Sequence, residues 1–300
     1  MRPASASPVS SFFLRLFFVF ASTRGYTILV LVAAQYLSAR YILAPSKNWL
    51  QHLTDGSLFL LVCASSLAIA GGYLINNFYD AEKDRINRPK QYLLHQALPP
   101  RAQLQFYFLF NLLCLAMAAY VSYKAFLFFV AYIFGLWLYS HFLKKMFWAS
   151  NLFAALLAIT PFFAIAIYFR NFSPWVMYHA GFLFLIILTR DLIKDLQNFR
   201  GDWVRNYRTV AIVFGKRFTK YIVTALLFLN TLPLYFLLKE PQSLGGMYFY
   251  FLACIPLLIS ILVLLWTSDR QKTYLWMHNI LKALLIAGVA SIVLVRFTPF

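Results

Sequence analysis

Nine apolar stretches alternate with short polar connections along the chain of 300 residues. A helix needs about 20 apolar residues to cross the hydrocarbon layer of a bilayer, and these stretches reach that length. The pattern predicts an all-α protein, a polytopic membrane helical bundle of about nine transmembrane helices. The expected spans are 26–44, 57–79, 104–122, 125–142, 150–169, 174–193, 219–238, 246–266 and 279–297. No polar stretch is long enough for a soluble domain, so 1–300 is expected to be a single integral-membrane domain.

The N-terminal residues contain a further apolar run, SFFLRLFFVFASTRG at 11–25. Arg15 interrupts its apolar core and the first span follows directly, whereas a secretory signal peptide has an unbroken core. We therefore expect 1–25 to be an interfacial segment that leads into the first span. The composition agrees with a membrane protein, since 62% of the residues are hydrophobic and only 12% are charged.

The net charge of +18 does not indicate a nucleic-acid partner, because the basic residues follow the membrane topology. The N-terminus and the connections after spans 2, 4, 6 and 8 hold all but six of the 27 Lys and Arg residues. The six on the other face are Arg40, Lys47, Lys124, Arg170, Lys239 and Arg296. The positive-inside rule then places the N-terminus in the cytoplasm and the C-terminus on the opposite side, with the inner cell membrane as the expected location.

Acidic residues are scarce and strongly clustered. Six of the nine fall in 80–84 and 191–202, at the cytoplasmic ends of spans 2 and 6. One such cluster alone is typical of a solvated helix end, but carboxylates at membrane depth are costly and usually functional. Two clusters on the same face of the membrane favour a functional site.

Helical spacing places the members of each cluster on one face. Asn76, Asp80 and Asp84 are four residues apart, and Asp191, Asp195, Asn198 and Asp202 follow at offsets of 4, 7 and 11. Gly201 could end the second helix before Asp202. Two converging acidic faces would hold one or more Mg²⁺ ions through oxygen ligands, and Mg²⁺ commonly bridges carboxylates to substrate phosphates. Neighbouring cations could bind the anion; they are Arg85, Arg88, Lys90, Lys194, Arg200, Arg205 and Arg208.

Other metal and redox sites find no support in the sequence. Three cysteines lie in different apolar spans without a CxxC spacing, and the five histidines never pair at a spacing suited to a metal. We interpret the cysteines as small core residues.

The first cluster, NNFYDAEKDRINRP, resembles the first motif of the UbiA-type intramembrane prenyltransferases, Asn-Asp-x-x-Asp-x-x-x-Asp followed by Asp-Arg-x-Asn-Arg-Pro. The positions that match are Asn76, Asp80, Asp84, Arg85, Asn87, Arg88 and Pro89. Asn77 departs from the pattern, because the family commonly has Asp there. The departure weakens one potential contact and keeps the carboxylates that would bind metal.

The second cluster, RDLIKDLQNFRGD, resembles the family's Arg-Glu-x-x-Lys-Asp-x-x-Asp-x-x-Gly-Asp motif. Asp191 replaces Glu, and Asn198 replaces the middle Asp, which leaves the number of metals open. Shorter matches are YSHFLKK at 139–145, Asn151 near a family Gly-Asn, RTVAIVFGK at 208–216, and Arg24, where Gly25 stands in place of the usual Pro.

This resemblance implies Mg²⁺-dependent transfer of a prenyl group from an allylic prenyl diphosphate to a lipophilic acceptor. It implies Asp80, Asp84, Asp195 and Asp202 as metal ligands, with Asn76 and Asp191 next. Arg85, Lys144 and Lys194 would contact the diphosphate, with Arg88 and Arg24 beside them, and Tyr139 would reach the reacting centre. The continuation DRINRP looks most like the branch that alkylates geranylgeranylglyceryl phosphate.

Three alternatives stay open. An aromatic acceptor such as 4-hydroxybenzoate or a quinone precursor is the near rival within the family. A multi-span transporter belongs to another class, but its ionic sites would favour the middles of spans, and these are nearly free of acidic residues. A purely structural membrane scaffold is the third alternative, and the clustered carboxylates argue against it.

Overall fold

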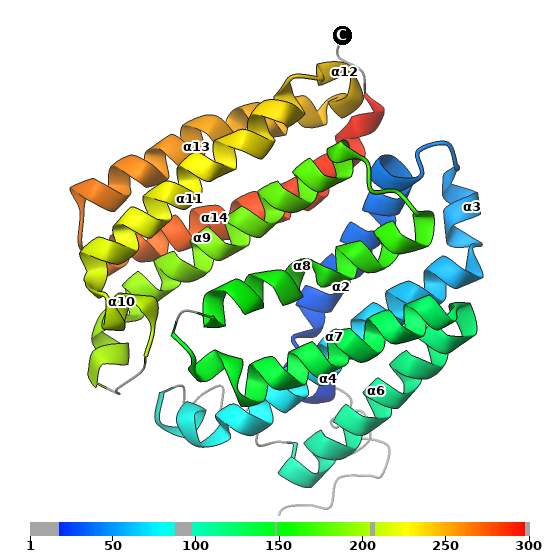
Figure 1. Ribbon diagram of the computed structural model, residues 1–300, viewed down its shortest axis with the longest axis horizontal. Coiled ribbons are helices and arrows are strands. Elements are labelled where there is room, and N and C mark those ends of the chain that lie inside the picture. The colour runs from blue at the N-terminus through cyan, green and yellow to red at the C-terminus, as the bar shows by residue number, and fades with distance from the viewer. Residues whose placement is uncertain (1–17, 88–97, 148, 205–207, 298–300) are drawn as a thin grey trace, which may run out of the picture. The chain divides into compact units, whose positions relative to one another are not determined.

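The computed structural model describes residues 18–87, 98–147, 149–204 and 208–297, without the side chains of 82–87. Within these residues the chain is helical and contains no strand, as Figure 1 shows. Nine of the described helices are long and apolar enough to cross a membrane, which confirms the predicted bundle. They span 25–43, 56–81, 100–121, 123–141, 150–169, 174–204, 215–238, 247–267 and 271–296. Most of the N-terminal segment lies outside the described residues, so its interfacial character stays a prediction.

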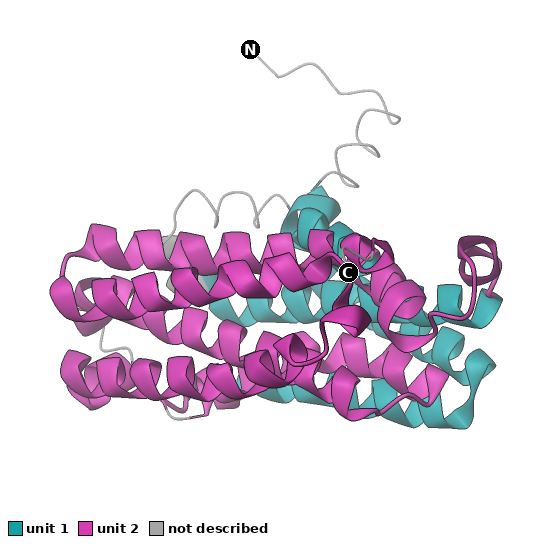
Figure 2. Ribbon diagram, turned by 90° about the horizontal axis from the view of Figure 1, so that it is seen from above, with its two compact units in different colours: residues 1–32, 56–141 teal, residues 33–55, 142–300 magenta. Residues whose placement is uncertain are grey.

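The chain divides into two compact units, coloured separately in Figure 2. Unit 1 comprises residues 1–32 and 56–141, and unit 2 comprises 33–55 and 142–300. The expectation of a single membrane domain stays a prediction.

Unit 1 is built around α4 (Gly56–Asn87), which packs against α6 (Pro100–Val121) and α7 (Tyr123–His141). Two adjacent glycines permit this packing. A Cβ on Gly71 would lie 3.0 Å from Asn111 Oδ1 of α6, and one on Gly72 would lie 3.2 Å from Leu136 of α7. Larger side chains would force both neighbours away from α4. The start of α2 (Gly25–Ser38) completes the unit.

Unit 2 is built around α9 (Pro174–Val204), which packs against α8 (Ser150–Phe169), α11 (Gly215–Leu238) and α14 (Gln271–Ser291). Ala155, Ile159 and Ile187 form a buried cluster between α8 and α9. α13 (Met247–Thr267) covers α11 and α14. The shorter elements are η1 (Ala39–Leu43), α3 (Trp49–Leu53), η2 (Leu143–Lys145), α10 (Val210–Val213), α12 (Pro241–Leu244) and η3 (Ile292–Arg296).

Several helices extend beyond their predicted apolar spans, three of them by the most. α4 continues to Asn87 and α9 to Val204, while α14 begins at Gln271 rather than near 279. Apolar length sets the membrane crossing, but backbone hydrogen bonds let a helix continue into polar sequence. Gly201 does not end α9, so Asp202 lies on the same helix as Asp191 and Asp195.

Candidate functional site

The first acidic motif lies on the last turns of α4. Asn76 Nδ2 donates to Asp80 Oδ2 at 3.3 Å, so these two side chains share a face as their spacing predicted. Asp84 belongs to the same continuous helix. The side chains of Asp84 and Arg85, and all of Arg88, lie outside the described residues.

Arg24 lies on the side of α4 that carries this motif. Its guanidinium carbon is 5.0 Å from the centre of the Tyr73 ring, and Tyr73 precedes Asp80 by two turns of α4. At 100° per residue, Tyr73 and Asp80 differ by only about 20° around the helix. Arg24 itself has a left-handed backbone (φ 52°) in the turn before α2. The structure therefore places the Arg24 cation over Tyr73, on the same side of α4 as Asp80, and a role for Arg24 in binding substrate stays a prediction.

Asn77 of α4 holds the turn that carries Arg24 by a hydrogen bond to the main chain of that turn. Its Nδ2 donates to the carbonyl oxygen of Ser22 at 2.9 Å, and both residues are buried. A carboxylate could not donate this hydrogen bond. The residue that departs from the family pattern is thus an amide that connects segments 55 residues apart.

The second acidic motif occupies the end of α9. Asn151, near the start of α8, donates from Nδ2 to Asp195 Oδ2 at 2.7 Å. The partly buried Asp195 also lies within electrostatic reach of Asp191, Lys194 and Asp202. Asp191, Asp195 and Asp202 are therefore near one another on α9, and their role as metal ligands stays a prediction.

Asp191 has a separate partner within this group. Arg190 Nη2 lies 3.0 Å from its Oδ1, and Arg190 Nε lies 3.2 Å from the same atom. His278 of α14 is close enough for the charges of Arg190, Lys194 and Asp191 to act on its ring. No local pattern marks this histidine, because α14 begins 67 residues after the end of α9.

Tyr139 and Lys144 lie on opposite sides of the division between the units. Tyr139 is partly buried near the end of α7 in unit 1, and Lys144 is partly buried in η2 of unit 2. η2 packs against α8, the helix that supplies Asn151. Lys144 therefore lies in the same unit as Asn151 and Asp195.

The oxygen donors of both motifs fit a hard divalent cation. Among the described side chains, no group of three or more His, Cys, Asp or Glu residues could hold a metal ion. Each unit contains its own acidic motif with carboxylate and amide oxygens, Asp80 with Asn76 in unit 1 and Asp195 with Asn151 in unit 2. The donor set is consistent with Mg²⁺ and offers no soft ligand that would favour a transition metal.

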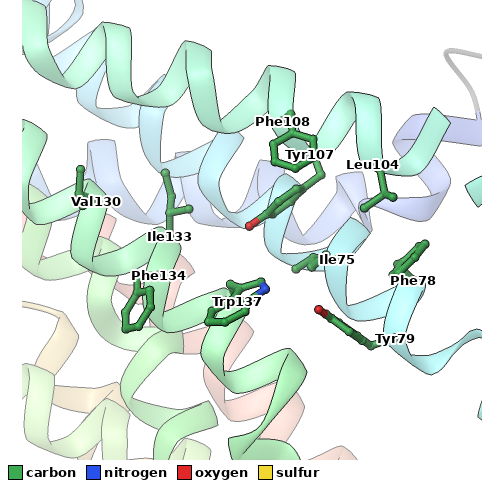
Figure 3. Close-up of a pocket in the computed structure, with 10 residues that line it drawn as sticks. All are labelled: Ile75, Phe78, Tyr79, Leu104, Tyr107, Phe108, Val130, Ile133, Phe134 and Trp137. Carbon is green, nitrogen blue, oxygen red and sulfur yellow. The ribbon is translucent and has the colours of Figure 1, made fainter. Parts of the chain in front are cut away.

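Unit 1 also contains an apolar groove of about 450 Å³, shown in Figure 3. Helices α4, α6 and α7 line it, with Tyr79, Tyr107 and Trp137 among its aromatic walls. Its α4 residues lie on a different side of that helix from Asn76 and Asp80. The groove is therefore separate from the acidic motif and forms part of the apolar surface of the bundle.

Comparisons with known proteins agree with this architecture. A family model described as UbiA prenyltransferase family matches residues 36–286. A digeranylgeranylglyceryl phosphate synthase from Thermococcus gammatolerans is 33% identical over 171 residues, which cover 56% of this chain and 61% of the relative. The match thus spans less than two thirds of that relative's length.

Two solved structures share the fold. One, described as a digeranylgeranylglyceryl phosphate synthase in membranes, has a TM-score of 0.74 at 20% identity, over 93% of this chain and 97% of that one. The other is a UbiA homolog from Archaeoglobus fulgidus bound to GPP and Mg²⁺. Its TM-score is 0.65 at 17% identity, over 92% of this chain and 99% of that one.

Proposed function

Because the chain belongs to the UbiA prenyltransferase family, we propose that it transfers the prenyl group of an allylic prenyl diphosphate to a lipophilic acceptor. The observation that carries this proposal is the pairing of carboxylates with amides and cations in both acidic motifs. Asp80 is joined to Asn76 and lies on the face that receives Arg24, while Asp195 is joined to Asn151 beside Lys194. These are the groups needed to bind a metal diphosphate.

Asp80, Asp84, Asp195 and Asp202 would hold Mg²⁺, with Asn76 and Asp191 as further oxygen donors. When bound, Mg²⁺ would supply positive charge to the diphosphate oxygens and favour their departure. The bond between Arg190 and Asp191 reduces the charge that Asp191 can offer a metal, so we rank this residue below the others.

The basic residues complete the charge balance. Arg24, Lys144 and Lys194 would donate to the diphosphate oxygens, and Arg85 and Arg88 would extend this set. As the bond from the allylic carbon to diphosphate breaks, these cations stabilise the negative charge of the leaving group. The acceptor hydroxyl oxygen then forms the new bond to the allylic carbon, and its proton passes to the released diphosphate. Tyr139 would lie near the allylic cation, where an aromatic face is stabilising.

We propose geranylgeranylglyceryl phosphate as the acceptor. The relative from Thermococcus gammatolerans carries the name digeranylgeranylglyceryl phosphate synthase, and the DRINRP continuation points to the same branch. An aromatic acceptor remains the alternative. We also propose that the acidic motifs and the N-terminus face the cytoplasm, since most basic residues adjoin them.

The test uses purified protein in nanodiscs with radiolabelled geranylgeranyl diphosphate and Mg²⁺. Separate reactions contain geranylgeranylglyceryl phosphate, 4-hydroxybenzoate or a naphthoate. The variants Asp80→Asn and Asp195→Asn remove one carboxylate from each motif, and Glu240→Gln serves as a control outside both motifs. We expect one labelled lipid product that is abolished by EDTA and reduced at least about 100-fold in both motif variants, with Glu240→Gln unaffected.

Each other outcome contradicts a defined part of the proposal. A product from an aromatic acceptor alone would overturn the assigned branch. Full activity in either motif variant would remove that motif from the site. If no acceptor reacts and vesicles instead take up a prenyl or organic anion along an ion gradient, the transporter alternative would replace the enzyme.

A further inference from the structure

We infer that Asn77 and Asn151 are positioning residues, one in each unit, which attach a cation-bearing segment to an acidic helix. This inference rests on the proposed function and assigns two further residues a positioning role in place of metal or substrate binding. In both cases a side-chain amide donates across a long interval of sequence, 55 residues for Asn77 and 44 for Asn151.

In unit 1 the attached segment is the turn that carries Arg24. Asn77 is 6% exposed, and it donates to the carbonyl oxygen of Ser22, which is 1% exposed. Ser22 lies two residues before Arg24, whose guanidinium rests over Tyr73. Tyr73 and Asn77 are one turn apart on α4, so the turn is held at two successive points on the face of Asp80.

In unit 2 the attached segment runs from η2 into α8. Asn151 is the second residue of α8, and its amide nitrogen lies 2.7 Å from Asp195 Oδ2. Ser150 Oγ donates to Asn151 Oδ1 at 3.4 Å, which orients the amide so that its nitrogen faces the carboxylate. The bond occupies one oxygen of Asp195 and leaves the other for a metal.

The chemistry of the amide distinguishes this role from that of a ligand. An aspartate at position 77 would place a carboxylate against the Ser22 carbonyl oxygen, and two acceptors repel. The family commonly has Asp at this position, where it could contact a metal. In this chain Asn77 instead donates to Ser22 and holds the turn that carries Arg24. The same replacement at position 151 would put two carboxylates in contact.

The experiment compares Asn77→Asp and Asn151→Ala with the wild type and with Asn171→Asp. Asn171 is the matched control, because its Nδ2 also donates to a main-chain carbonyl, that of Leu43, at 2.8 Å and away from both motifs. Hydrogen exchange of residues 18–27 measures attachment of the Arg24 turn. Steady-state kinetics separate kcat, the KM for geranylgeranyl diphosphate and the Mg²⁺ concentration for half-maximal rate.

We expect Asn77→Asp to accelerate exchange in 18–27 and to raise the KM for the diphosphate about 10-fold. Asn151→Ala should raise the Mg²⁺ requirement about 10-fold or more, and Asn151→Gln, which keeps an amide donor, should restore part of it. Asn171→Asp should lower thermal stability and leave all three kinetic parameters unchanged.

Two results would overturn the inference: unchanged exchange and KM in Asn77→Asp, or equal shifts in Asn171→Asp. If the wild type transfers no prenyl group, the proposed function fails separately. The inference is then decided by thermal stabilisation of the protein by geranylgeranyl diphosphate with Mg²⁺. Stabilisation should decrease in both test variants and persist in Asn171→Asp; equal stabilisation in all variants would refute it.

Discussion

Lys220 and Asp269 form an ion pair whose two members differ sharply in exposure. Lys220 Nζ, on α11, lies 2.9 Å from Asp269 Oδ1 in the connection between α13 and α14. The Lys220 side chain is 7% exposed, whereas that of Asp269 is 70% exposed. Tyr274 donates to the same carboxylate oxygen at 2.8 Å. Loss of the two charged residues should therefore have unequal effects.

Asp269→Ala leaves the Lys220 ammonium buried without this acceptor and also frees the Tyr274 hydroxyl. A hydrogen bond to a charged group contributes about 1.5–3 kcal/mol. Water reaches Asp269 and weakens both hydrogen bonds, so we do not add two full contributions. We expect Asp269→Ala to lower the free energy of unfolding by about 2 kcal/mol in total. Lys220→Met leaves a carboxylate that still accepts from Tyr274 and is solvated by water, so the cost should stay below about 1 kcal/mol. The double variant should be more stable than Asp269→Ala alone.

Thermal unfolding in detergent measures these differences. We expect Asp269→Ala to lower the melting temperature by about 4 °C, Lys220→Met by less, and the double variant by an intermediate amount. Glu240→Ala is the control and should change nothing, because this exposed carboxylate accepts from Ser243 at a long 3.5 Å. The reasoning is refuted if Lys220→Met costs as much as Asp269→Ala, or if the two losses add in the double variant.

Further predictions concern pH and packing. The hydrogen bond from Lys220 lowers the pKa of Asp269, so the advantage of wild type over Asp269→Ala should be complete above about pH 4 and decline below it in melting curves. Burial lowers the pKa of His52, so the 44–55 connection should be fully stable above about pH 6.5 and less stable on acidification. Limited proteolysis at pH 5.5 and 7.5 checks this prediction. His52→Asn should remove the pH dependence. A Cβ on Gly288 would lie 2.7 Å from the Tyr250 hydroxyl, so Gly288→Ala should cost about 1–3 kcal/mol in thermal unfolding, whereas Gly181→Ala, with open space, should not destabilise.

The sequence alone determined the membrane crossings and the composition of each acidic face. Hydrophobic length is a local property, because about 20 apolar residues in succession are costly to expose to water and sufficient to span the bilayer. The facial grouping of Asn76 with Asp80, and of Asp191 with Asp195, is also local, since it follows from the 3.6-residue period of the helix. These predictions needed no knowledge of which segments meet.

Only the tertiary structure decided which segments are joined to those faces. The bonds from Asn77 to Ser22 and from Asn151 to Asp195 connect residues 55 and 44 positions apart, which no local period relates. The approach of His278 to Arg190 and Asp191 was equally hidden, because α14 and α9 are distant in sequence. The continuation of α9 past Gly201 was also open from the sequence, because one glycine in a helix costs only about 1 kcal/mol relative to alanine. In the structure α9 runs on to Val204 and packs against α10 and α11.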